Sequence, residues 1–306
     1  MSTEGDTASE LTCFLCDSGS QVDLPYVNFG LMRWPRRVAY GIPPAIGKWL
    51  SRLSGKFEGS YRSIEATNEY FAPRRKIWCN TCMTGTCDPP FSAVRLGRYY
   101  EQFYWSNRDI ADGQHLEKEN RPSEIQLWWA NSRLGWLAQE LSICTSMIDF
   151  GAGDCAASFV VAEKYPLVKV HVVDPSLKAK RLAEQFGFGW HPDLEGIEPV
   201  DLIYSAHSIE HVHDLRQTLG DMVGKLKDGG YIFLETPNIP SLEVFANVLH
   251  TPHTFMLSKH SFAELVKHFP LEVVRTDFFG PEYRLNFPET DSTAQTDLRI
   301  LLKKSC

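Results

Sequence analysis

Two acids and a pair of glycines form the pattern in this chain that could most readily bind a ligand. The segment Asp149-x-Gly151-x-Gly153 follows an apolar run over 146–148, and Asp174 ends a second apolar run about twenty residues later. Glycines let the backbone approach a ligand without a Cβ in the way. A carboxylate at the end of the next strand can hold ribose hydroxyls. The pattern predicts a nucleotide-like cofactor across the carboxyl ends of two parallel strands.

Strands and helices alternate from Ser146 onward. The predicted strands cover 146–150, 168–173, 200–204, 230–235, 271–278 and 297–303. The predicted helices lie near 155–164, 176–186, 214–227 and 259–268. Such alternation implies right-handed crossovers and a parallel sheet. No helix is predicted between the last two strands, so they are expected to form an antiparallel hairpin.

Four segments in this order resemble the class I methyltransferases that use S-adenosyl-L-methionine (SAM). They are the glycine turn at 149–153, Asp174-Pro175-Ser176, the segment 201–212 with Glu210-His211-Val212, and the segment 226–238 with the letters LKDGGYIFLETPN. The resemblance covers residues 146–303. It implies an α/β fold, with a Rossmann-like seven-stranded sheet whose last strand is antiparallel.

The resemblance also implies roles for individual residues. The glycine turn would line the methionine end of SAM, Asp174 would accept the ribose hydroxyls, and the end of the fourth strand would lie beneath the methyl donor. The cofactor-binding residues implied in this way are Asp149, Gly151, Gly153, Asp174, Pro175, Ser205, Ala206 and His207. Cys155 stands where the family has a third glycine, which governs how closely helix and strand pack.

A nicotinamide dehydrogenase is the rival interpretation of the glycine turn. It would favour a G-x-G-x-x-G pattern near the start of the chain, with a phosphate at the helix N-terminus. Asp154 follows Gly153 directly and would repel a pyrophosphate. SAM carries no phosphate, so the order of the motifs favours the methyltransferase.

Histidines supply the candidates for catalysis. Methyl transfer to a hydroxyl needs a base near neutral pH, and histidine provides one most readily. The candidates are His211 first and His253 second, followed by His207 and Glu210. The segment 207–211 also fits the H-x-x-E-H pattern of zinc proteases, but it follows a predicted strand directly and overlaps the methyltransferase segment.

Two Cys-x-x-Cys pairs predict a metal site in the first third of the chain. Cys13 with Cys16 and Cys79 with Cys82 can close a tetrahedral, structural Zn²⁺ site. Four buried thiols are the alternative, and Cys87 could replace one ligand. The segment 88–91, Asp-Pro-Pro-Phe, matches a motif of adenine amino-methyltransferases, but no apolar strand precedes it, so a proline-rich turn is expected there.

An aromatic stripe follows the cysteines. Tyr99, Tyr100, Phe103 and Tyr104 recur at helical spacing, and Tyr104 or Tyr100 is a candidate for contact with SAM. The Cys-x-x-Cys pair, the prolines and this stripe together resemble a bacterial subset of methyltransferases with an N-terminal zinc module. That resemblance implies an acceptor among sugars, glycan precursors or secondary metabolites. The sugar C-methyltransferases of this subset carry a further C-terminal domain that is not expected here, so O-methylation is favoured.

Composition limits the remaining choices. The expected organisation is a disordered tail over 1–10, a zinc-binding module over 11–92, a helical linker or lid over 93–145 and the methyltransferase domain over 146–306. A net charge of −7 argues against a nucleic-acid partner. The sequence shows no secretory signal or membrane span, and its cysteine usage fits a reducing compartment, so a cytoplasmic location is expected.

Three functions stay open on the sequence alone. The first is a small-molecule O-methyltransferase, the second a nucleic-acid or tRNA methyltransferase that uses the zinc module as a binding arm, and the third a non-catalytic SAM-binding scaffold. A homodimer is compatible with each of them.

Overall fold

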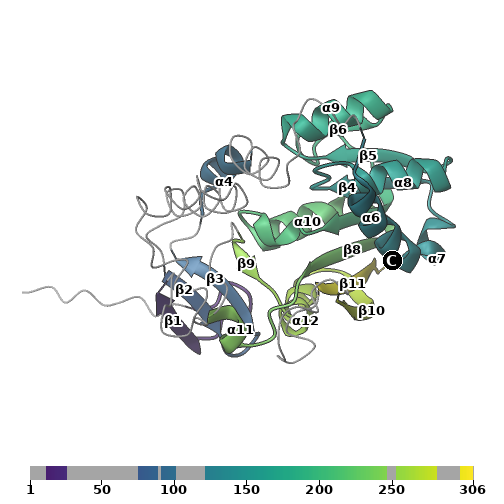
Figure 1. Cartoon of the computed structure of the whole chain (residues 1–306). Helices are drawn as coiled ribbons and strands as arrows, with labels where there is room; N and C mark the ends of the chain where they lie inside the picture. Colours follow the sequence, from purple (N-terminus) through teal and green to yellow (C-terminus); the bar gives the residue numbers. More distant parts are fainter. Residues whose placement is uncertain are drawn as a thin grey trace, which may run out of the picture.

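The structure is a computed structural model of the whole chain, in which two β-sheets lie side by side (Figure 1). The residues that it describes are 12–25, 75–88, 91–100, 121–246, 253–280 and 297–305. The predicted tail over 1–10 and the aromatic residues Phe103 and Tyr104 lie outside these ranges. In the described part of the chain, no helix is long and apolar enough to cross a membrane.

The larger sheet has seven strands in the order β10-β11-β8-β7-β4-β5-β6. The strands are β4 (Ser146–Phe150), β5 (Lys169–Val173), β6 (Gly189–His191), β7 (Val200–Ala206), β8 (Leu226–Pro237), β10 (Leu271–Phe279) and β11 (Asp297–Lys304). Within this described sheet, β11 runs antiparallel to the other six strands and lies between β8 and β10. This arrangement confirms the predicted Rossmann-like sheet. The sequence prediction missed β6, because three residues are too short to show a period of two.

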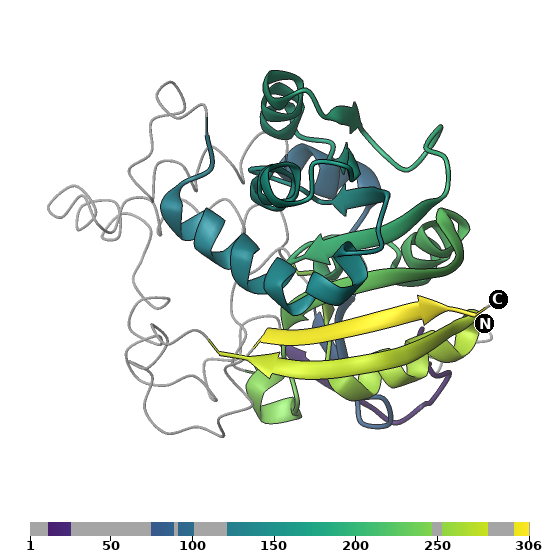
Figure 2. The same cartoon turned by 90° about the vertical axis from the view of Figure 1, so that its right-hand side faces the viewer.

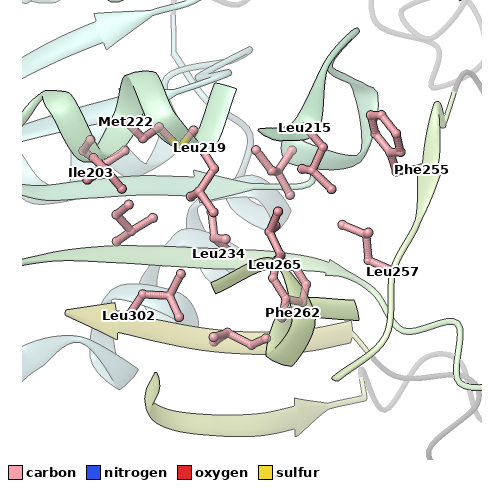
Figure 3. Close-up of a cluster of buried hydrophobic side chains, with 14 of the residues drawn as sticks. Ile203, Leu215, Leu219, Met222, Leu234, Phe255, Leu257, Phe262, Leu265 and Leu302 are labelled. Atoms are coloured by element: carbon pink, nitrogen blue, oxygen red, sulfur yellow. The ribbon is translucent and has the colours of Figure 1, made fainter. Parts of the chain in front are cut away.

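Helices cover both faces of this sheet because side chains alternate along its strands. The helices are α6 (Glu124–Trp136), α7 (Ala138–Leu141), α8 (Ala156–Lys164), α9 (Leu177–Phe186), α10 (Leu215–Gly224) and α12 (Lys259–Leu265), the last followed by the 3₁₀ turn η3 (Val266–His268). On β8, Phe233 packs with α6 and α8. Its neighbour Leu234 faces the other way, where it meets α10 and α12 (Figure 3).

The two long antiparallel strands β10 and β11 form one edge of the large sheet, and α6 lies across the sheet above them (Figure 2). The helix prediction for 93–145 is met in the described parts by α4 (Ala93–Tyr99), α6 and α7.

The smaller sheet joins strands from the first third of the chain to one strand from the last third. Its strands are β1 (Gln21–Pro25), β2 (Arg75–Cys79), β3 (Thr84–Asp88) and β9 (Phe255–Met256), in that order and all antiparallel. Because β9 comes from the C-terminal third, the cysteine-bearing segment shares a sheet with the region predicted to be the methyltransferase domain. The helix α11 (Leu242–Ala246) packs beneath this sheet, where Phe245 meets Trp78.

Topology brings the candidate residues to one edge of the large sheet. The parallel strands β4, β5, β7 and β8 all end there, and the antiparallel strand β11 begins there. β4 lies between β5 and β7, so the strand order reverses at this point. Open α/β sheets bind their ligands outside the carboxyl ends of the strands at such a reversal.

Candidate active site

The turn after β4 requires glycine. Gly151 has φ +69° and Gly153 has φ +54°, a region that residues with a Cβ rarely adopt. A Cβ on Gly151 would lie 2.2 Å from the Ser208 hydroxyl oxygen, which donates a hydrogen bond to the Gly151 carbonyl (3.1 Å). The Gly151 N–H donates to the carbonyl of Val173 on β5 (2.7 Å). The backbone of this turn therefore packs closely against the segment after β7 and is held to β5.

Asp149 lies under the turn. Its Oδ2 accepts hydrogen bonds from the hydroxyl (2.6 Å) and the N–H (3.2 Å) of Ser158, which ties β4 to α8. Burial raises its pKa from 3.8 to about 7. The third-glycine position is filled by Cys155, which is fully buried and adopts φ +58°. A small side chain thus fits at this turn, although its left-handed backbone would suit glycine better.

Asp174 meets the turn from β5. Its Oδ2 accepts a hydrogen bond from the Gly153 N–H (2.9 Å), and its Oδ1 accepts one from the Ser176 N–H (2.8 Å). Ser176 in turn caps α9 by accepting from the N–H of Ala179 (3.2 Å). Pro175 between them is exposed. The acid and the glycine turn, separated in sequence, are in direct contact because β4 and β5 are parallel neighbours.

β7 ends in Ser205 and Ala206, and His207 follows it directly. The Ser205 hydroxyl is buried and has no hydrogen-bond partner among the residues that the structure describes. His207 adopts φ +53°, and its N–H donates to the carbonyl of Glu235 on β8 (2.8 Å). This left-handed residue turns the chain back over the sheet edge and leads into the 3₁₀ turn η2 (Ile209–His211). The segment is not the α-helix that a zinc-protease motif needs.

The imidazole of His207 lies among three carboxylates. Its Nδ1 is 3.5 Å from Glu210 Oε1, and its Nε2 is 3.3 Å from Glu235 Oε1 and 3.6 Å from Asp297 Oδ2. Burial lowers the pKa of His207, but the three carboxylates outweigh burial and hold the pKa well above its ordinary value. An imidazolium cation of this kind donates hydrogen bonds and is a poor base.

Glu235 is a site residue that the sequence analysis missed, together with its two arginine partners. Arg133 on α6 donates from Nε to Glu235 Oε1 (2.6 Å), and Arg299 on β11 donates from Nε to Oε2 (2.5 Å). Burial raises the pKa of Glu235, but His207 and Arg133 lower it by more than that and keep it below its ordinary value. The sequence signal that could have identified two of these residues is a charged side chain within an apolar strand, which is Glu235 in β8 and Arg299 in β11.

A second cluster joins two of the predicted catalytic histidines to Glu210. His211 Nε2 lies 3.9 Å and His253 Nε2 lies 4.0 Å from Glu210 Oε1. The two imidazole rings meet edge to face with centroids 4.5 Å apart, and the ring of Tyr100, the residue after α4, packs against His211 at 5.4 Å. Burial raises the pKa of Glu210, but the neighbouring histidines lower it to about 2.

The four predicted cysteine ligands converge on one point. The sulfur atoms of Cys13 and Cys82 lie 3.6 Å apart, as do those of Cys16 and Cys79, and all four lie within 4.8 Å of one another. Cys87 is not in this group. The turn that carries Cys13 and Cys16 is held to α10, which covers the large sheet. Arg216 on α10 donates from Nη2 to the carbonyl of Leu15 (2.7 Å).

The small sheet also holds the loop that carries His253. Thr86 on β3 donates from its hydroxyl to the carbonyl of Thr254 (3.1 Å). The Thr254 N–H donates to the carbonyl of Glu210 (2.8 Å). One buried threonine thus connects the cysteine-bearing sheet to both parts of the histidine cluster.

The sheet order, the glycine turn and the acid after the second parallel strand define a class I SAM-dependent methyltransferase. Comparison with protein families agrees, because the profile described as "Methyltransferase domain" matches residues 105–276. The chain belongs to that family. No protein of curated function matches it in sequence.

Solved structures of methyltransferases are similar to this chain at low sequence identity. A 1,6-didemethyltoxoflavin-N1-methyltransferase from Burkholderia thailandensis, solved with S-adenosylhomocysteine, is 14% identical over 77% of this chain and 97% of its own, with a TM-score of 0.51. A SAM-dependent methyltransferase from Archaeoglobus fulgidus is 16% identical over 66% and 100% of the two chains (TM-score 0.49). The N-methyltransferase NodS from Bradyrhizobium japonicum is 15% identical over 58% and 97% (TM-score 0.42).

Proposed function

We propose that this methyltransferase transfers the methyl group of SAM to a hydroxyl of a small molecule, such as a sugar, a glycan precursor or a secondary metabolite. One observation carries the proposal. The glycine turn with Asp174, and the histidine cluster around Glu210, lie at the same edge of the sheet on adjacent strands. The residues that we propose to bind the cofactor and those that we propose to accept the proton therefore share one edge of the sheet.

The residues that follow β4 and β5 fit SAM. The turn at Gly151 and Gly153 would take the methionine part, and the Asp174 carboxylate has lone pairs left for ribose hydroxyls after its two backbone hydrogen bonds. Asp149 supports the turn from below through Ser158. Bound SAM supplies an electrophilic methyl group on a sulfonium. The predicted contact from Tyr104 lies outside the described residues.

The residues after β7 and in the loop before β9 fit an acceptor hydroxyl. An imidazole of His211 or His253 takes the hydroxyl proton as the oxygen attacks, and Glu210 between them stabilises the charge that forms. The neighbouring carboxylates hold His207 as a cation. His207 would therefore orient the acceptor hydroxyl and would not deprotonate it. Much of the rate then comes from alignment of donor and acceptor.

The cysteine cluster fits a structural Zn²⁺. Zinc–thiolate bonds of about 2.3 Å in a tetrahedron put the sulfur atoms about 3.8 Å apart, close to the observed 3.6 Å. Four thiolates leave no position for water or substrate, so this metal would stabilise the small sheet. The described cysteines form no disulfide, which fits the reducing cytoplasm expected from the sequence.

A small acceptor is favoured over a nucleic acid because the net charge is −7. The preference for oxygen rests on the histidine cluster. The names of two structural neighbours describe methylation of nitrogen, so nitrogen acceptors belong in the test.

The test is an acceptor screen with SAM that carries a labelled methyl group. Sugars, sugar nucleotides, phenols and amines are offered to the wild type and to His211→Ala and His253→Ala, with the exposed His260→Ala as a matched control. A methylated product that is lost in the first two variants supports the proposal. Unchanged product in both would refute the base assignment, and SAM binding without any product would favour the scaffold.

A further inference from the structure

The Glu210 carboxylate is buried, and within the described part of the chain it lies among imidazole groups. The side chain is 1% exposed, and neither oxygen accepts a hydrogen bond from any residue in the described part of the chain. A buried carboxylate is costly unless donors or a cation compensate it. The nearest groups are imidazole nitrogens at 3.5–4.0 Å, which is too far for good hydrogen bonds. The His207 imidazolium lies on one side of Glu210 Oε1, and the imidazoles of His211 and His253 place two nitrogen donors near the same oxygen.

The donor set around this carboxylate is one that divalent metals prefer. Glu210, His211 and His253 each place one ligand atom within 4.8 Å of the other two. Two imidazole nitrogens and one carboxylate oxygen suit first-row transition metals and leave coordination positions open. Bonds of about 2.1 Å would bring the ligand atoms to about 3.0–3.4 Å from one another, which is about 0.5–1 Å closer than the observed 3.9–4.0 Å.

The neighbouring carboxylates do not form an equivalent site. His207, Glu235 and Asp297 also place three ligand atoms within 4.8 Å. However, Glu235 already has two guanidinium groups at 2.5 and 2.6 Å, one on each oxygen. Its charge is satisfied, so a metal there would have to displace an arginine. His207, as a cation, lies within 3.6 Å of Glu210, Glu235 and Asp297.

We propose that Glu210, His211 and His253 bind a divalent transition-metal cation that holds the acceptor hydroxyl. The inference rests on the proposed function and changes one role in it, because the two imidazoles become ligands instead of bases. The cation binds the acceptor oxygen and weakens its O–H bond, and the proton leaves to water. The oxygen lone pair then forms the O–CH₃ bond while the S–CH₃ bond of SAM breaks, which yields S-adenosylhomocysteine.

Binding is tested on the full chain with Mn²⁺, because Mn²⁺ prefers oxygen and nitrogen donors and does not compete for the four thiolates. Loss of the free Mn²⁺ signal in electron paramagnetic resonance measures the binding. We expect one Mn²⁺ per wild-type chain, with affinity at least tenfold weaker in Glu210→Gln and in His253→Gln and unchanged in His260→Gln. Zinc content and melting temperature identify any variant that fails to fold.

Activity separates this inference from the proposed function. Mild chelation that leaves the cysteine-bound zinc in place is expected to abolish methyl transfer, and added Mn²⁺ is expected to restore it. Absence of Mn²⁺ binding by the wild type, or equal binding by both variants, overturns the site. Full activity after chelation overturns its role and leaves the methyltransferase proposal intact. Mn²⁺ binding without any methyl transfer overturns the proposed function alone.

Discussion

Replacement of Asp174 by alanine tests the cofactor site most directly. The carboxylate already accepts hydrogen bonds from the N–H groups of Gly153 and Ser176, and it keeps lone pairs for the ribose hydroxyls. Hydrogen bonds to a charged group contribute about 1.5–3 kcal/mol each. Because water compensates part of that loss, we expect Asp174→Ala to weaken SAM binding by about 1.4–2.7 kcal/mol, or roughly 10- to 100-fold.

The assay is calorimetric titration with S-adenosylhomocysteine, which binds without turnover. Asp174→Asn keeps one acceptor oxygen and should fall between the wild type and Asp174→Ala. Ser176→Ala is the matched control, because it removes the α9 cap and costs about 1 kcal/mol of stability without touching the carboxylate. If folded Asp174→Ala binds within twofold of the wild type, the ribose does not lie on this acid and the site is misplaced.

Three further predictions concern the turn, the buried acid and the cysteines. Gly151→Ala should weaken SAM binding at least tenfold, because its Cβ meets Ser208 and its φ adds about 1–2 kcal/mol of strain; Ser208→Gly in the same chain should recover part of the loss, and wild-type affinity in the single variant would contradict this. Burial raises the pKa of Asp149 to about 7, so the native state binds a proton that the unfolded state releases near pH 4. The free energy of unfolding should therefore fall as the pH rises from about 4 to about 7, by up to about 4 kcal/mol. Denaturant titrations of Asp149→Asn should lack that part of the slope, and an unchanged slope would refute the assignment. Elemental analysis should find about one zinc per chain, and Cys82→Ser should lose both the zinc and methyl transfer, since β3 holds the loop that carries His253. A zinc-free variant with full activity would count against that coupling.

The cofactor half of the candidate site was largely predictable from the sequence. Strand β4, the glycine turn and Asp174 are local features, and two parallel strands joined by one helix must end at the same edge. Cys155 is the one departure from the family pattern, and the structure shows that its left-handed backbone is compatible with a small buried side chain.

The acceptor half depended on contacts that no local pattern contains. Glu235 and Arg299 lie 64 residues apart in sequence, and Arg133 comes from a helix before the sheet. His253 reaches Glu210 because β9 adds to the cysteine-bearing sheet and positions the loop before it. Such pairings are fixed by how the sheets and helices pack, so a prediction from periodicity could name the histidines but could not group them.

The sequence by itself determined the order of strands and helices, the glycine turn with its acid, and the two cysteine pairs, because each is encoded by spacing within a short segment. Only the tertiary structure decided which carboxylates surround which histidines. It places His207 among three acids as a cation and leaves Glu210 buried between His211 and His253. The physical reason is that the charge state of a buried group depends on its neighbours in space, and those neighbours come from strands and loops far apart in the chain.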